Sequence, residues 1–196
     1  SRGLVGSEMC IRDSINILFF ILLTLTSKLN AKENIMILKL KDGDVKIEMF
    51  PDVAPNHVKR ITELANSGKY DNVVFHRVID GFMAQTGDVK FGNSSSSDFN
   101  LQRAGMGGSD LPDLKQEFND LPHERGTVSM ARSSDPNSAN SQFFICFESA
   151  SYLDRNYTVF GKVIEGMEFV DKIKKGDGPN GSCLLYTSPS PRDLWI

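Results

Sequence analysis

Apolar and polar residues alternate through the first regular part of the chain. This alternation predicts two strands, over residues 35–40 and 45–50. Between them stands the pair Asp42-Gly43, which supplies the positive backbone angles of a tight turn. The two strands are therefore expected to form a hairpin.

The spacing of apolar residues then changes from two to the helical period. Pro51 and Pro55 interrupt the alternation, and Val58, Ile61 and Leu64 recur at helical spacing until Gly68. One amphipathic helix is predicted here, because Pro55 suits the first turn of a helix. Further strands are predicted over 73–78, 82–86, 127–131, 142–147 and 158–163, and a second short helix over 168–174.

Many short strands with few helices indicate a mainly β domain. The pattern alone leaves open a β-barrel and a sandwich. Residues 91–104, which contain four consecutive serines, are too polar for a strand and are expected to form a surface loop. The glycine cluster 105–108 reads as a flexible turn, since no Gly-Lys-Ser/Thr ending follows that would make it a phosphate loop.

The composition of the chain argues against two classes of function, nucleic-acid binding and metal binding. With 196 residues and 40% hydrophobic content, the chain has room for one domain with a buried core. A formal charge of -3 and a pI of about 5.6 argue against a nucleic-acid binder. The three histidines share no ligand spacing with each other or with Cys146, so no metal site is expected.

The two ends differ from the middle. Residues 15–26 form an apolar run, and residues 15–31 have the shape of a signal peptide with cleavage after Ala31; a retained membrane anchor is the alternative. A periplasmic location is therefore expected. Residues 1–14 and 182–196 resemble translated sequencing-adapter sequence and are set apart, which leaves a domain over 33–181. It holds one cysteine, Cys146, and so no internal disulfide.

Two blocks combine an arginine, a glutamine and large apolar residues: FHRVIDGFMAQTGD (75–88) and MARSSDPNSANSQFFIC (130–146). Arg77 stands in an apolar strand pattern. It could be a salt-bridged arginine in the wall of the fold, or a donor aimed into a pocket. A Ser-His-Asp hydrolase is disfavoured, because the chain has no G-x-S-x-G motif.

Together with YTVFGKVIEGMEFVDKI (157–173), these blocks resemble the cyclophilin family of peptidyl-prolyl cis/trans isomerases in its bacterial variant. The resemblance runs from about Asn34 to about Gly181. It implies a closed eight-stranded antiparallel β-barrel capped by two α-helices. Because the family continues after a GPNG-like segment into a last strand, that strand is expected to be missing here, with a frayed seam near Gly181.

The resemblance also implies a site. Arg77 is the expected catalytic residue, a donor to the imide nitrogen, and Gln85 is expected to contact the substrate backbone. The proline pocket is expected to be lined by Phe82, Met83, Phe144 and Leu153, with the peptide bound along Ala131, Arg132 and Ser133 and with Gln142 matched as well. For any one apolar member taken alone, ordinary core packing is the competing interpretation.

Three positions depart from the family pattern. Tyr152 stands where many members carry tryptophan, Tyr157 where many carry histidine, and Met106 where a threonine is usual. Both tyrosines keep an aromatic wall, but the indole donor is lost, so weak cyclosporin binding is expected.

The expected function is rotation of Xaa-Pro bonds in proline-containing segments of unfolded or folding exported proteins, by a monomer without cofactor, metal or nucleic acid. A proline-peptide binding module or holdase without turnover is the alternative.

Overall fold

The computed structural model describes residues 34–183, and a compact unit begins at Asn34. The predicted signal peptide, the first adapter-like segment and all of the second except Ser182 and Cys183 lie outside the described residues. Within 34–183, no helix has the length and apolar character needed to cross a membrane.

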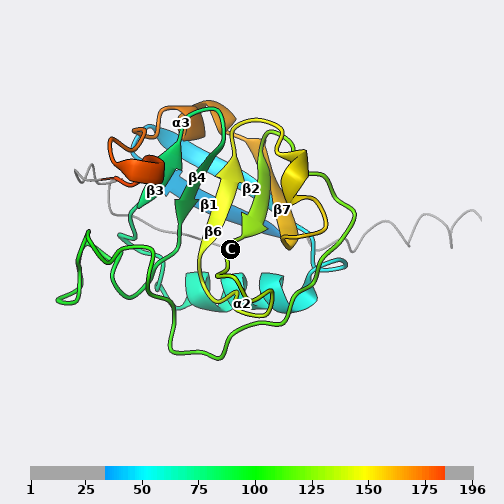
Figure 1. Cartoon of the computed structure of the whole chain (residues 1–196), viewed down its shortest axis with the longest axis horizontal. Helices are drawn as coiled ribbons and strands as arrows, with labels where there is room; N and C mark the ends of the chain where they lie inside the picture. The colour runs from blue at the N-terminus through cyan, green and yellow to red at the C-terminus, as the bar shows by residue number, and fades with distance from the viewer. Residues whose placement is uncertain (1–33, 184–196) are drawn as a thin grey trace, which may run out of the picture. The chain divides into compact units, whose positions relative to one another are not determined.

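The predicted hairpin and first helix are confirmed. Strand β1 (Ile35–Leu40) pairs antiparallel with β2 (Gly43–Met49), and the turn closes with Leu40 opposite Gly43. Helix α2 (Pro55–Asn66) has a proline in its first turn and buries Val58, Ile61 and Leu64 on one side. In Figure 1, α2 lies across one end of the sheet and α3 (Met167–Asp171) at the opposite end.

The strands of residues 34–183 form one antiparallel sheet in the order β1-β2-β7-β5-β6-β4-β3. The sheet curls without closing fully into a barrel (Figure 1), so the described residues give seven strands in place of the eight of the family pattern. The remaining strands are β3 (Arg77–Ile79), β4 (Met83–Thr86), β5 (Thr127–Met130), β6 (Phe143–Cys146) and β7 (Val159–Glu165).

The strand predicted over 73–78 is wrong in its bounds. Of its residues, only Arg77 and Val78 belong to β3, and Val73 forms an isolated bridge with Asn93. The backbone of the preceding residues is used by the long loop instead, since the Val74 amide donates to the Gly92 carbonyl at 2.9 Å. The second helix is also shorter than predicted, and it starts one residue earlier.

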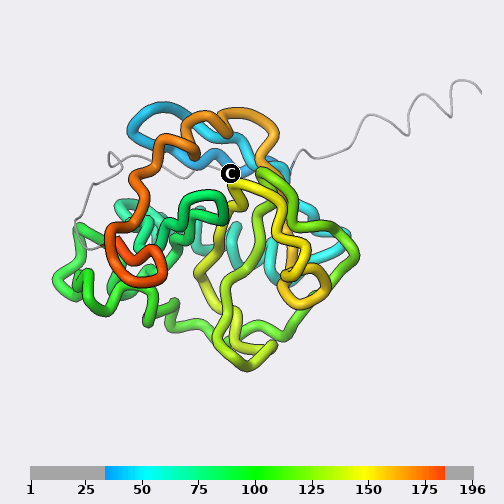
Figure 2. The backbone as a smooth tube through the Cα atoms, turned by 45° about the horizontal axis from the view of Figure 1, so that its top comes forward, coloured from blue at the N-terminus to red at the C-terminus, as the bar shows by residue number. Residues whose placement is uncertain are grey.

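The chain after α3 returns to the outer edge of β3. The Gly176 amide donates to the Val78 carbonyl and the Cys183 amide to the His76 carbonyl, both at 2.9 Å. Ser182 bridges Arg77, and the short 3₁₀ helix η2 (Pro179–Gly181) precedes it. Figure 2 shows this last described segment beside β3. The barrel is open as expected, but the residues around Gly181 are paired to β3 and do not fray.

Strand alternation separates two apolar clusters. On β6, Phe143 and Ile145 enter the large core shared with β1, β2 and α2, whereas Phe144 and Cys146 enter a second cluster. Since successive side chains of a strand point to opposite faces, the second cluster lies on the outer face of the curled sheet. Its other buried members are Met83, Ala150 and Leu153.

Candidate active site

Register places the predicted residues in one row across four strands. Arg77 on β3 stands opposite Gln85 on β4, Gln85 stands opposite Phe144 on β6, and Phe144 opposite Ser129 on β5. Partners in a ladder point to the same face of the sheet. At the outer end of this row, Arg77 bonds to Asn180, which is 103 positions away in the sequence.

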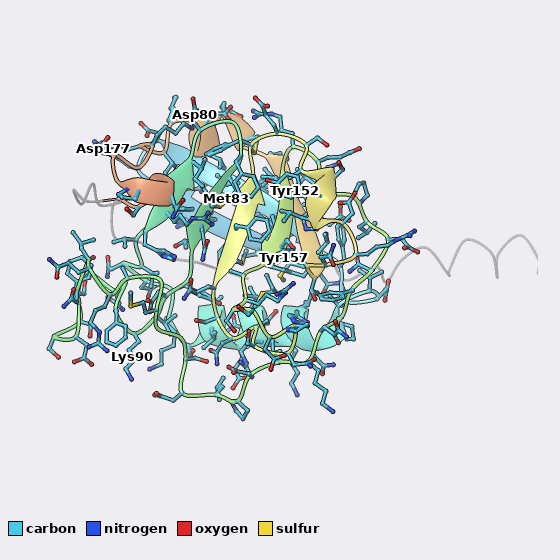
Figure 3. The ribbon with its side chains drawn as sticks, in the orientation of Figure 1. Asp80, Met83, Lys90, Tyr152, Tyr157 and Asp177 are labelled. Atoms are coloured by element: carbon cyan, nitrogen blue, oxygen red, sulfur yellow. The ribbon has the colours of Figure 1, made fainter. Side chains whose placement is uncertain are left out.

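A pocket of about 90 Å³ opens on this face. Figure 3 shows Met83, Tyr152 and Tyr157 in front of the strands, with Lys90 and Asp177 toward the periphery. Nine of the residues predicted from the sequence line the pocket: Arg77, Phe82, Met83, Gln85, Ala131, Arg132, Phe144, Leu153 and Tyr157.

The Arg77 guanidinium is half-buried and held on two sides. Its Nε donates to the Asn180 carbonyl at 3.0 Å, and its Nη1 lies 3.4 Å from Gln85 Oε1. Because these bonds fix the stem and one edge of the guanidinium at the pocket wall, the charge faces the cavity and does not turn into the core. Asn180 has a φ of 55°, and no pattern in the sequence indicates that its carbonyl reaches Arg77.

A chain of side-chain amides joins this arginine to the glycine cluster. Gln85 Nε2 donates to Gln142 Oε1 at 2.9 Å, and Gln142 Nε2 donates to the carbonyls of Gly105 and Gly107 at 2.9 and 2.7 Å. Gln142 therefore positions Gln85 and stands one step back from the pocket.

The glycine cluster is fixed from the other side by a buried carboxylate. Asp88 accepts hydrogen bonds from the amides of Gly105 and Gly107 and, at the start of the loop, from those of Lys90 and Phe91. A fully buried carboxylate with four backbone donors is well satisfied. Both ends of the long loop are thus held beside the site.

A second, wider hollow of about 400 Å³ adjoins the pocket and shares Gln85, Ala131 and Arg132 with it. Ser133 and Gln142, predicted as substrate-binding residues, line this hollow and not the smaller pocket. Met106 also borders it, with 78% of its surface exposed. The sequence does not separate the two cavities, because residues of the blocks 75–88 and 130–146 line both of them.

The two tyrosines take different places. Tyr157 lines the pocket, and the Arg132 guanidinium lies over its ring at 4.5 Å. Tyr152 lies outside the lining. It is 68% exposed, and its ring centroid is 5.8 Å from that of Phe82.

A Ser-His-Asp set does exist in the described residues, although the sequence disfavoured a hydrolase. His123 Nδ1 lies 2.9 Å from Asp154 Oδ1, and its Nε2 lies 3.0 Å from Ser129 Oγ. Ser129 is fully buried, however, opposite Phe144 on the neighbouring strand, so its hydroxyl has no access to a substrate. The arrangement carries no nucleophile.

Comparisons with known proteins agree with this geometry. A family model described as cyclophilin type peptidyl-prolyl cis-trans isomerase/CLD matches residues 35–187. A probable peptidyl-prolyl cis-trans isomerase of Brucella suis is 60% identical over 151 residues, which cover 76% of each chain. Peptidyl-prolyl cis-trans isomerase A of Dickeya dadantii is 39% identical over 71% of this chain and 70% of its own.

Solved structures show the same fold. A cyclophilin-type isomerase of Cryptosporidium parvum, solved in the presence of the dipeptide Ala-Pro, superposes with a TM-score of 0.66 at 29% identity, covering 83% of this chain and 98% of that one. A cyclophilin of Hirschia baltica gives a TM-score of 0.62 at 28% identity, covering 76% and 71%. The chain therefore belongs to the cyclophilin-type peptidyl-prolyl cis-trans isomerases, the enzymes that interconvert the cis and trans forms of Xaa-Pro peptide bonds.

Proposed function

We propose that the pocket of about 90 Å³ clasps the proline ring of the substrate and that Arg77 is the catalytic residue. The observation that carries this proposal is the position of the guanidinium. It borders a pocket lined mainly by apolar and aromatic side chains, while Asn180 and Gln85 hold its other edge. A salt-bridged arginine in the wall of the fold would instead face a carboxylate.

The reaction needs no covalent step. Rotation about an Xaa-Pro bond breaks amide resonance against a barrier of roughly 18–20 kcal/mol. The nitrogen lone pair localises only when the peptide plane is lost. A permanently charged donor directed at that nitrogen stabilises the twisted amide more than either planar form, and this difference lowers the barrier.

Apolar side chains are proposed to bind the proline ring. Phe144 forms the floor through its place in the strand row, and Phe82, Met83, Leu153 and Tyr157 complete the walls. They exclude water, which strengthens the interaction of the guanidinium with the substrate nitrogen.

The segment 131–133 is the proposed edge for the substrate backbone. The Ala131 amide already donates to the Gln142 carbonyl, and the Ser133 amide to Ser138 Oγ, both at 2.9 Å. Since those two amides are engaged, the backbone of Arg132 between them is proposed to pair with an extended peptide. Gln85 is proposed to contact the same peptide from the opposite wall.

The proposed clients are proline-containing segments of exported proteins, met as they fold in the periplasm by a monomeric enzyme. This part rests on the sequence of residues 15–31, which lie outside the described residues. The mass of the exported protein tests it, because cleavage after Ala31 leaves a chain that begins at Lys32. An exported protein that retains residues 15–31 would favour the anchored form.

Magnetisation-exchange NMR on an Ala-Pro peptide tests the role of Arg77. In Arg77→Ala, exchange between the cis and trans signals should fall by about 10²–10³, while peptide binding persists through the apolar pocket. Arg103→Ala is a matched control, because that guanidinium stacks on Phe91 at 3.8 Å in the long loop, outside both cavities. Undiminished exchange in Arg77→Ala would overturn the assignment.

A further inference from the structure

His123 is a buried histidine in the loop before β5, where it lies directly behind the proline pocket. Only 1% of it is exposed. Asp154, at the end of the short 3₁₀ helix η1 (Ser151–Leu153), binds it twice: Oδ1 accepts from the His123 backbone amide at 2.8 Å and lies 2.9 Å from the ring Nδ1. On the other side, Ser129 Oγ lies 3.0 Å from Nε2 and 3.0 Å from the Thr158 carbonyl.

Each ring nitrogen therefore lies within hydrogen-bond distance of an oxygen atom. Ser129 is anchored in β5, and the amide and ring of His123 hold the pKa of Asp154 below its usual range, so that its acceptor is a carboxylate at neutral pH. An imidazole bonded at both nitrogens has one defined plane, whereas an apolar ring in the same space would be oriented by packing alone.

That plane bears on two walls of the pocket. The His123 ring stacks on Phe144 with centroids 6.1 Å apart and planes 15° apart. It meets Tyr157 edge-on at 6.5 Å and 83°, and Phe144 and Tyr157 meet each other at 5.9 Å and 83°. The three rings form one mutually packed group, and two of its members line the pocket.

We propose that His123, held by Asp154 and Ser129, is a positioning residue that sets the orientation of Phe144 and Tyr157 and thereby the shape of the proline pocket. The proposal rests on the proposed use of that pocket for the substrate proline. It gives the Ser-His-Asp set a role that requires no attack on a substrate: the polar groups align aromatic surfaces against which the peptide rotates.

Asp154→Ala tests the proposal, because a third of the Asp154 side chain is exposed and its removal opens no cavity inside the core. Without the carboxylate, the ring loses one of its two anchors. Turnover in the exchange assay at saturating Ala-Pro peptide should fall about tenfold through misalignment, and the ring resonances of Phe144 and Tyr157 should shift. Asp154→Asn keeps an oxygen acceptor and should recover most of both losses.

Asp120→Ala is the matched control. Asp120 pairs with Arg155, next to Asp154, but its side chain is 85% exposed and does not line the pocket. Thermal melts of each variant separate positioning from a merely structural role. Normal turnover in Asp154→Ala, or a loss accounted for by the unfolded fraction at the assay temperature, would overturn the proposal.

The two proposals fail separately. If Arg77→Ala keeps full exchange, the assignment of Arg77 falls, whereas the ring shifts in Asp154→Ala still report whether His123 orients Phe144 and Tyr157.

Discussion

At the scale of single residues, the site is built from side chains that are each held by a second group. Arg77 is fixed by the Asn180 carbonyl and Gln85, and Arg132 spans from the Asn156 carbonyl to that of Ser133. Long cationic side chains lose much conformational freedom on binding unless they are already ordered. Both guanidiniums are therefore ordered at the pocket before any ligand binds.

Tyr152 is the residue whose substitution should change the affinity for cyclosporin. Its exposed ring stands beside Phe82 without an indole N–H. Tyr152→Trp should bind cyclosporin about tenfold more tightly, the value of one added hydrogen bond. Fluorescence titration measures the affinity, with Tyr152→Phe as the control that changes the ring without adding this donor. A tryptophan variant that binds no better than the phenylalanine variant would contradict the prediction.

At the scale of elements, distant segments complete one another. The residue preceding α2 is Ala54, whose side chain offers no cap. Glu117 takes that role from a loop 60 residues later: its carboxylate accepts from the amides of Asn56 and His57 and lies 2.6 Å from His57 Nδ1. Helix termini need such acceptors, and an acidic group there also complements the helix dipole.

The turn between β7 and α3 depends on a glycine with no room for a side chain. Gly166 has a φ of 84°, and an added Cβ would press on the Asp44 carbonyl oxygen and lie 3.0 Å from Val45 Cα. Gly81 has a similar φ of 67° but 4.0 Å of space to Glu148. Gly81→Ala should cost about 1 kcal/mol of unfolding free energy, and Gly166→Ala about 1–2 kcal/mol more. Chemical denaturation measures both; equal losses would mean that the close approach at Gly166 has no cost.

The elements that can be predicted from the sequence are those set by neighbouring residues in the chain. The hairpin follows from Asp42-Gly43 and the start of α2 from Pro55. Helix α2 begins at the predicted residue, and the hairpin forms as predicted, although β2 begins two residues earlier, at Gly43. The hydrogen-bond acceptor at the start of α2 could not be predicted, because nothing in the sequence around Glu117 indicates that it contacts Asn56 and His57. The strand over 73–78 was overestimated for the same reason: its apolar residues fit a strand, but the Val74 amide is bound by Gly92.

The candidate site divides in the same way. The lining residues could be named because they sit in blocks with a family likeness, whereas their order in space came from register alone. No spacing rule places Ser129 opposite Phe144, or joins His123 to Asp154 across 31 residues.

At the scale of the whole molecule, stability is linked to buried histidines. His57 and His76 are enclosed, and neither His57 Nε2 nor either ring nitrogen of His76 has a hydrogen-bond partner among the described residues. Burial lowers the pKa of both, that of His76 from 6.5 to about 4. A neutral ring in the folded state and a protonated ring in the unfolded chain favour unfolding in mild acid.

Below pH 6.5, His76 is protonated in the unfolded chain but stays neutral in the folded protein. The unfolding free energy should therefore drop as pH falls toward 4. At pH 5 the loss from His76 alone is about 2 kcal/mol relative to pH 7.5. Urea denaturation at the two pH values measures it. In His76→Gln this share of the drop should vanish; an undiminished drop would assign the acid sensitivity elsewhere.

Asp88 has a consequence for how this chain can vary. Its carboxylate ties the amides of Lys90 and Phe91 to those of Gly105 and Gly107, so the loop leaves and rejoins the domain at one rigid point. Evolution or a protein engineer should therefore be able to change the length or sequence between residues 94 and 99 without disturbing the candidate site, because Asp88 holds the chain on both sides of the change.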